Sequence, residues 1–229
     1  MPASSLESAL LGVVRARADS AAAWMAGVRP TDMDAFCGAY TAAARKAGRE
    51  LLALTEAERI ALGSSAPEAR FDRWTVADAA RAALLLRAAD ALDAADFQAL
   101  AIGCFERGDA GEQASWMRAV ALLPSPERFL PIVIDSCRTN VVPLFEAIAC
   151  ENPYPAKYFP ERNFNQMVLK ALFNSIAIRR IVGLAERMNP ELARMASDYA
   201  AERRAAGRSV PPDIALAAPD EGRTEGAAR

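Results

Sequence analysis

The chain contains no histidine in its 229 residues. Histidine is the commonest general base near neutral pH and a ligand in most catalytic zinc sites. Its absence therefore excludes Ser-His and Cys-His nucleophile pairs and most catalytic zinc sites. Any chemistry would depend on carboxylates, lysine, tyrosine, cysteine or a partner protein, and we predict neither a cofactor nor a metal site.

Cysteine is scarce, and its spacing has no metal-binding or redox pattern. Cys37, Cys104, Cys137 and Cys150 lie far apart, with no C-x-x-C pair. Each stands in an apolar stretch with helical character, which favours a reduced, buried thiol over a reactive one. Reduced thiols are typical of the cytosol, so we expect a cytoplasmic protein.

An excess of basic charge and long apolar runs are also missing. The 27 Lys and Arg residues face 29 Asp and Glu residues, for a formal net charge of −2, which gives no electrostatic case for nucleic acid. No run approaches the ~20 apolar residues that cross a bilayer, and the first residues lack the pattern of a signal peptide. Dinucleotide, P-loop, zinc-protease and calcium-loop motifs are absent. We expect a protein that neither binds nucleic acid nor inserts into a membrane.

Helix-forming residues and helix-start signals dominate what is present. The chain is 52% apolar, and apolar residues at spacings of three and four predict a first helix over residues 6–26. Residues 176–184 also have helical, apolar character. Capping residues before apolar runs predict further helix starts at Thr31, Thr55, Thr75, Asp93, Asp109, Ser125, Asn140, Asn163 and Asn189.

The starts between Thr75 and Asn140 recur about every sixteen residues. Short helices joined by tight turns form antiparallel hairpins, and successive hairpins stack as an α-solenoid. We therefore predict an all-α fold of antiparallel helical hairpins in an irregular α-solenoid, with a helical bundle as the alternative because no consensus repeats. A single domain is expected over residues 1–207. Residues 208–229 have little to bury and are predicted to form a disordered tail.

The stretch from Asp135 to Lys170 departs from this alanine-rich composition. Pro153, Pro155 and Pro160 prevent a continuous helix, so we expect a long proline-rich loop without secondary structure over residues 150–163. Loops of this length inside a compact domain are often functional. The stretch is therefore the predicted location of a ligand-binding site.

The candidate ligand-binding residues are polar or aromatic side chains among large apolar neighbours. Arginine offers planar donors to carboxylate or phosphate, and a carboxylate on an apolar helix face needs a partner. Each candidate has a structural alternative: an ion pair, a helix cap, a solvent-facing position or simple packing. The candidates are Arg138, Glu146, Glu151, Asn152, Tyr154, Tyr158, Asn165 and Lys170.

The same stretch resembles a known family. The run D-x-C-R-T-N-V-V-P-L-F-E-A-I-A-C-E-N-P-Y-P-A-K-Y-F-P-E-R-N-F-N-Q-M-V-L-K-A-L-F is similar to the EboA family of bacterial proteins. The likeness continues through R-I-V-G-L, N-P-E-L-A-R-M-A-S-D-Y-A-A-E-R-R-A-A-G-R and V-P-P-D-I, so it covers about residues 135–214. Earlier residues match only in general helical character.

The resemblance implies a cytoplasmic protein that takes part in moving a secondary metabolite or its precursor. It also implies a gene cluster with a UbiA-like membrane prenyltransferase and a TatD-like hydrolase, but no catalytic residues. Our first hypothesis is a non-catalytic accessory that binds a small metabolite or a protein of the same cluster. The alternatives are an enzyme that modifies a metabolite precursor, with Glu146 or Glu151 acting beside Lys170 and Arg138, and a purely structural helical scaffold.

Overall fold

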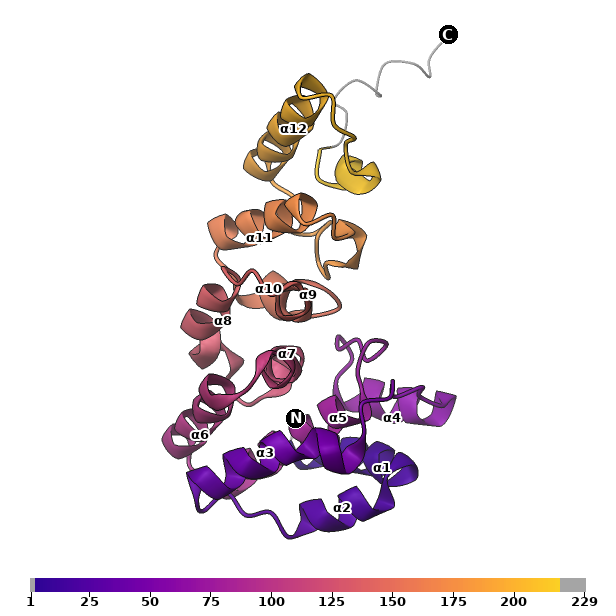
Figure 1. Ribbon diagram of the computed structural model, residues 1–229, viewed down its shortest axis with the longest axis vertical. Helices are drawn as coiled ribbons and strands as arrows, with labels where there is room; N and C mark the ends of the chain where they lie inside the picture. The colour runs from indigo at the N-terminus through magenta and orange to yellow at the C-terminus, as the bar shows by residue number, and fades with distance from the viewer. Residues whose placement is uncertain (1–2, 219–229) are drawn as a thin grey trace.

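The chain is all-α, as predicted. The computed structural model describes residues 3–218, which contain twelve α-helices, four short 3-10 helices and no β-strand. An isolated antiparallel bridge joins Leu51 to Thr75. The helices are stacked along the longest axis of the molecule, with α1–α5 at one end and α12 at the other (Figure 1).

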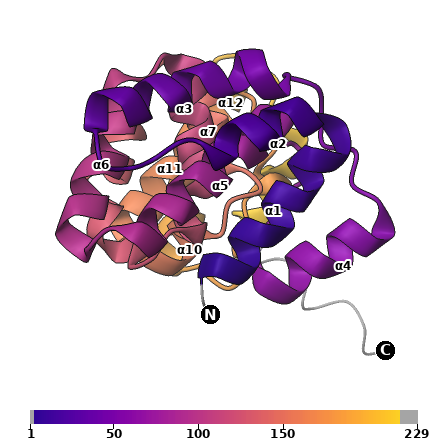
Figure 2. The same cartoon turned by 90° about the horizontal axis from the view of Figure 1, so that it is seen from below.

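The first layer is built around one central helix. Its elements are α1 (Ala3–Arg17), α2 (Asp19–Ala26), α3 (Met33–Ala47), α4 (Glu56–Ser65) and α5 (Val76–Ala91). Seen from below, α1, α2 and α3 cover α5, and α4 packs on the outside of α1 (Figure 2). The sequence of α5 is apolar on nearly every side, and a helix without a polar face is buried.

The later helices continue the stack. They are α6 (Ala94–Arg107), α7 (Ala110–Ala119), α8 (Leu130–Ser136), α9 (Val142–Ala149), α10 (Tyr154–Tyr158), α11 (Glu161–Phe173) and α12 (Pro190–Ala205). Helix α7 packs on both α5 and α9, α9 packs on α11, and α11 packs on α12. From α5 to α11, alternate helices therefore pack on one another along the stack, and α12 packs on its immediate predecessor. The irregular α-solenoid of antiparallel hairpins stays a prediction.

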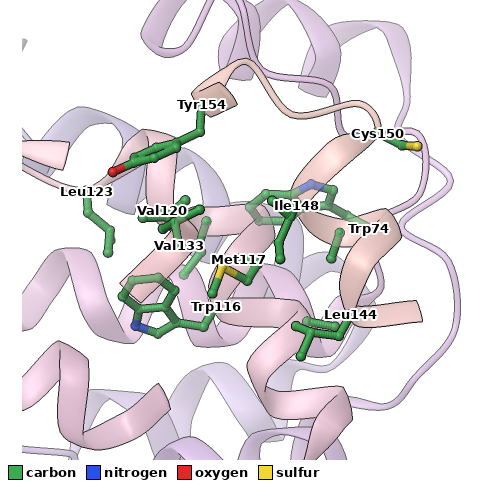
Figure 3. Packing of buried hydrophobic residues seen from close by; sticks show 14 of the residues in the cluster. Trp74, Trp116, Met117, Val120, Leu123, Val133, Leu144, Ile148, Cys150 and Tyr154 are labelled. Atoms are coloured by element: carbon green, nitrogen blue, oxygen red, sulfur yellow. The ribbon is translucent and has the colours of Figure 1, made fainter. Parts of the chain in front are cut away.

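Large apolar side chains pack around α7. Trp116 is fully buried, and its ring meets those of Phe105 and Phe129 with centroids 5.2 and 5.3 Å apart. Its indole nitrogen donates to the carbonyl of Ala101 at 2.8 Å, which satisfies the one polar atom of the side chain. Figure 3 shows Trp116 and Met117 of α7 in one cluster with Leu144 and Ile148 of α9.

Five of the predicted helix starts are confirmed by side-chain caps. Thr55, Thr75 and Asp109 each form a reciprocal capping box with the acidic residue three positions later. Asp93 and Asn189 accept hydrogen bonds from backbone amides in the first turns of α6 and α12. Each of these caps forms between residues at most three positions apart, so it can be predicted from the sequence alone.

Three predicted starts are wrong, and a fourth, Ser125, stands at its predicted position without a side-chain cap. Asp32 caps α3 in place of Thr31, and Ser125 has left-handed backbone without a capping bond before the 3-10 helix η2 (Pro126–Phe129). Helix α9 starts after Val141, not at Asn140, and α11 starts after Pro160, not at Asn163. Proline fixes a helix-compatible φ in the first turn, so α9 begins beside its proline without a polar cap.

Three further predictions of element boundaries need correction. Residues 6–26 form two helices because Ala18 leaves helical geometry, with φ −149° and ψ 72°. The proline-rich segment contains α10, with Pro155 tolerated in its first turn. Of the predicted helix over residues 176–184, only the 3-10 helix η3 (Ile178–Arg180) forms.

The predicted disordered tail begins too early. Residues 212–216 form the 3-10 helix η4 (Pro212–Leu216), which packs on η3 and buries Ile214. A few well-spaced apolar residues are enough to anchor this segment. Residues 219–229 of the predicted tail lie outside the described residues.

Candidate functional site

A cleft opens between the loop after α4 and the segment formed by α10, η3 and the residues that follow η3. Its volume is ≈ 900 Å³, within the range of small-molecule sites. A second cavity of ≈ 230 Å³ adjoins it, because Arg70, Glu151 and Arg180 line both. We call the two together the arginine cleft, after the lining residues Arg70, Arg73, Arg118, Arg179, Arg180 and Arg187.

Arg180 is held by two carboxylates. Its Nε and Nη2 donate to the two oxygens of Glu151 at 2.7 and 2.9 Å, and its Nη1 donates to Glu146 Oε1 at 2.7 Å. These hydrogen bonds raise the pKa of Arg180 above its ordinary value, against the opposing effect of burial. The guanidinium is therefore fixed and permanently charged where the two cavities meet.

Glu151 adopts an unusual backbone to make this contact. Its φ is 52°, in the left-handed region that costs a non-glycine residue about 1–3 kcal/mol. The Glu151 amide donates to the Arg180 carbonyl at 3.0 Å while the two side chains form their bidentate pair. The strain at the end of α9 is thus offset by a backbone and a side-chain contact with one residue.

The opposite wall carries two arginines without a protein partner. Arg70 and Arg73 are exposed and make no hydrogen bond or ion pair with residues 3–218. Their loop is nevertheless anchored, since Phe71 and Trp74 are buried with ring centroids 4.9 Å apart. The Trp74 carbonyl also accepts a hydrogen bond from Leu52 at 2.9 Å. The loop therefore presents two free guanidinium groups from a fixed base.

An ion pair joins the two walls. Lys157 on α10 pairs with Glu68 in the loop, and both residues line the larger cavity. Their side chains are about half exposed, with relative accessibilities of 46% and 55%. An exposed pair of this kind contributes little to stability, about 0–1 kcal/mol. The Lys157–Glu68 pair therefore connects the two walls but contributes little to holding them together.

Three predicted site residues lie at the arginine cleft. Glu146, Glu151 and Asn152 all line its smaller cavity. The Asn152 side chain is buried and its amide is fully used: Nδ2 donates to the carbonyls of Met117 and Ala147, and Oδ1 accepts from the Tyr154 amide. Asn152 therefore shapes the wall, whereas the two carboxylates hold Arg180.

Two other predicted residues lie at a separate cavity of ≈ 350 Å³ between α8 and α11. Lys170 donates to the carbonyls of Cys137 and Thr139 at 2.6 Å, and its Nζ lies 5.1 Å from the Phe145 ring centroid. Arg138 is exposed and pairs with Asp135 at 2.9 Å. The structure thus separates Lys170 and Arg138 from Glu146 and Glu151, the carboxylates with which the enzyme hypothesis combines them.

The remaining predicted residues line neither of these sites. The Tyr154 hydroxyl donates to the Pro126 carbonyl at 2.8 Å, and Tyr158 packs on its ring at 4.7 Å. Burial raises the pKa of Tyr154 above its ordinary range. The amides of Asn165 and Asn189 exchange two hydrogen bonds at 3.1 and 3.0 Å, which ties α11 to the start of α12.

A buried charged network escaped the sequence analysis. Arg81 donates to the Tyr40 carbonyl and to Ser115, and pairs with Glu112 at 3.6 Å; Ser115 in turn donates to Asp78. These charged side chains are almost inaccessible, yet every buried side-chain polar atom of the described chain has a partner. The signal that could have revealed the network is charge inside a helix that is otherwise apolar all round.

This network reaches the arginine cleft through one residue. Arg118 on α7 pairs with Asp78 at 3.3 Å and also lines the smaller cavity of the cleft. The buried carboxylate of Asp78 therefore partly neutralises the charge of Arg118. A further cavity of ≈ 470 Å³ lies on the other side of Arg118 and is lined by Asp78, Arg81 and Ser115.

The described residues carry neither a metal site nor a membrane span. Residues 3–218 contain no group of three or more Cys, Asp or Glu side chains placed to hold a metal ion. Within the same residues, no helix combines the length and apolar character that crossing a membrane requires.

Comparison with known proteins supplies the family. The family model described as "Metabolite traffic protein EboA" matches residues 22–217 of the chain. The chain belongs to the EboA family. The match confirms the resemblance found after Asp135 and extends it toward the N-terminus, so it includes every residue that lines the arginine cleft of this EboA protein. Searches among curated proteins and solved structures gave no match.

Proposed function

We propose that this EboA protein is a non-catalytic accessory of metabolite traffic that binds a small metabolite in the arginine cleft, in the cytoplasm. Family membership supports the traffic role in general terms. The observation that carries the binding role is the cleft itself, whose ≈ 900 Å³ suits a small molecule and whose walls come from distant segments of the chain. Four free cysteines agree with a reducing compartment.

A non-catalytic role is supported by how the candidate groups are used. Glu146 and Glu151 are both engaged by Arg180, and Lys170 caps backbone carbonyls at another cavity. The carboxylates and the lysine of the enzyme hypothesis are therefore occupied by separate partners. Ligand binding without catalysis needs neither of them as an acid or a base. Partner proteins, including a UbiA-like membrane prenyltransferase, stay a prediction from the resemblance.

The proposal is tested by filling the cleft. Val182 is partly buried and lines the larger cavity, so Val182→Trp should displace a bound small molecule. Gln166→Trp places the same ring at the separate cavity between α8 and α11 and serves as control. Native mass spectrometry of full-length chains purified from their own cells should show a retained small molecule in the wild type and control only.

Circular dichroism melting confirms that both variants are folded before their ligands are compared. A folded Val182→Trp chain that retains the same molecule at the same occupancy contradicts binding in the cleft. A wild-type chain that retains no small molecule under native conditions also contradicts the proposal.

A further inference from the structure

The arginine cleft carries positive charge that the protein does not neutralise. Four guanidinium groups line the smaller cavity, and the carboxylates that line it, Glu146 and Glu151, are both paired with Arg180. Arg118 is paired with Asp78. Arg70 and Arg73 keep their full charge, with no hydrogen bond or ion pair to the described chain.

The larger cavity repeats this imbalance. Arg70 lines it too, and the Arg179 side chain makes no hydrogen bond or ion pair with residues 3–218. Glu68 is paired with Lys157, and Arg187 donates to the carbonyls of Ala156 and Phe159. Among the lining carboxylates of this cavity, Glu186 alone has no ion pair within the described chain. A positively charged groove therefore extends along the whole cleft.

The backbone that carries the free charges of Arg70 and Arg73 is anchored. Arg70 and Arg73 alternate with the buried rings of Phe71 and Trp74, so the backbone that carries them is pinned on both sides. On the facing wall, Arg180 cannot move away without leaving Glu146 and Glu151 unpaired. Arg180 is therefore fixed before a ligand binds, whereas the side chains of Arg70 and Arg73 become ordered on binding.

We propose that the ligand of the arginine cleft carries an oxyanion, a phosphate or a carboxylate, which Arg70 and Arg73 bind. This inference rests on the proposed function and names the chemical class of its ligand. Guanidinium groups match the planar geometry of these anions with paired donors. The apolar part of the ligand lies against Ile181, Val182 and Pro153 in the larger cavity.

Other ligand classes fit the cleft less well. A cationic ligand would meet the unpaired arginines, and its only unpaired carboxylate partner in the larger cavity is Glu186. A neutral apolar ligand would leave both guanidinium groups in a partly closed site with less water, which costs free energy. The formal net charge of −2 on the whole chain argues against a nucleic-acid backbone as the source of the phosphate.

The inference is tested with a matched pair of charge variants of the full-length chain. Arg70→Gln/Arg73→Gln removes the two free charges of the cleft. Arg15→Gln/Arg45→Gln removes two equally exposed arginines that line none of the cavities described above and make no ion pair within residues 3–218. Titration calorimetry with inorganic pyrophosphate, and separately with decanoate, measures Kd for the wild type and both variants and distinguishes phosphate from carboxylate.

At least one probe should bind the wild type and the control equally and should bind Arg70→Gln/Arg73→Gln about tenfold or more weakly. Wild-type affinity should also fall as salt is raised, since the attraction is electrostatic. The inference is overturned if neither probe binds, or if both double variants bind alike.

The retained small molecule separates this inference from the function on which it rests. If Val182→Trp loses the molecule while Arg70→Gln/Arg73→Gln keeps it at full occupancy, the cleft binds a metabolite and the oxyanion class is wrong. If Val182→Trp also keeps the small molecule, both the oxyanion inference and the proposed binding role are wrong.

Discussion

Individual polar side chains of the stretch between Asp135 and Lys170 differ in what they do. Asn152 makes three hydrogen bonds from a buried position, whereas Arg138 makes one exposed ion pair, with 80% of its side chain accessible. Both were predicted as ligand-binding residues on the same grounds, namely a polar side chain among apolar neighbours. Burial, which the sequence does not report, separates them.

Asn152→Ala should lower the free energy of unfolding by about 2–4 kcal/mol, because it leaves two buried carbonyls and one amide without partners. Arg138→Ala should change it by less than about 0.5 kcal/mol. Urea unfolding at neutral pH measures both. An effect of Asn152→Ala as small as the one expected for Arg138→Ala would show that the Asn152 contacts contribute nothing to stability.

Glu58 makes stability depend on pH. A bidentate contact with Arg17 at 2.7 and 2.8 Å lowers the pKa of Glu58 from 4.5 to about 2. The carboxylate form is thus favoured in the folded state. Its contribution is complete above the ordinary pKa of 4.5 and is lost as the pH falls toward 2.

Glu58→Gln should therefore destabilise the protein by about 1 kcal/mol at pH 6, less than the full shift implies because the pair is partly exposed to solvent. The difference from the wild type should shrink as the pH is lowered from 4.5 toward 2. Glu202→Gln, at an exposed position, is the control. Urea unfolding midpoints of the wild type and both variants are measured across this pH range. A difference between the wild type and Glu58→Gln that does not change with pH counts against a role of the Arg17–Glu58 ion pair.

At the scale of elements, capping boxes on α4 and α5 allow one interaction to be compared in two settings. Thr55 starts α4, which packs on the outside of α1, and Thr75 starts α5, the central helix of the first layer. The two caps share the same chemistry. Their consequences differ because the helices differ in how much of the molecule depends on them.

Thr75→Val and Thr55→Val should each remove a cap worth about 1–2 kcal/mol. The loss at Thr75 should lower the global urea midpoint, whereas the loss at Thr55 should mainly speed amide exchange within α4. Hydrogen exchange followed by mass spectrometry separates local from global opening. Equal shifts of the global midpoint would mean that α4 unfolds only with the whole chain.

The helix starts also show how far the sequence predicts this fold. Thr75 and Asp109 were identified correctly because a capping box is complete within four residues. Asn140 and Asn163 were misassigned because α9 begins at Val142, with Pro143 in its first turn, and α11 begins directly after Pro160. A helix start is predicted correctly where a capping side chain alone determines it. The prediction fails where a nearby proline starts the helix in place of the capping residue.

The candidate site was only partly predictable. Glu146 and Glu151 were named from their apolar surroundings, but their partner Arg180 lies 29 or more positions later in the chain. Arg70 and Arg73 resemble any exposed arginine in the sequence, and only the folded chain sets them across from Arg180. The charge pattern of the cleft depends on contacts between distant segments, which composition and periodicity do not encode.

At the scale of the whole molecule, α7 connects the two ends of the stack. It packs on α5 in the first layer and on α9 beside the arginine cleft, and its residue Arg118 pairs with Asp78 on α5. Destabilisation in the first layer should therefore be transmitted to the cleft, and the chain should unfold as one cooperative unit.

Leu10→Ala tests this expectation. Leu10 is fully buried in α1, the helix that packs most extensively on α5, and its truncation should cost about 2–5 kcal/mol. Amides of α11 should lose the same protection as amides of α1 if the unit is single. Ile60→Ala, at a 62% exposed side chain, is the control. Loss of protection confined to the first layer would indicate two independent units.

The packing of α1 on α5 has a consequence for synthesis on the ribosome. Leu10, Val13 and Val14 form an apolar face whose main partner begins at Val76, so that partner does not yet exist when α1 emerges. At translation rates of about 5–20 residues per second, the intervening chain takes several seconds to appear. During that interval the face of α1 is exposed to solvent, and nascent chains halted before residue 76 should be the ones that chaperones bind.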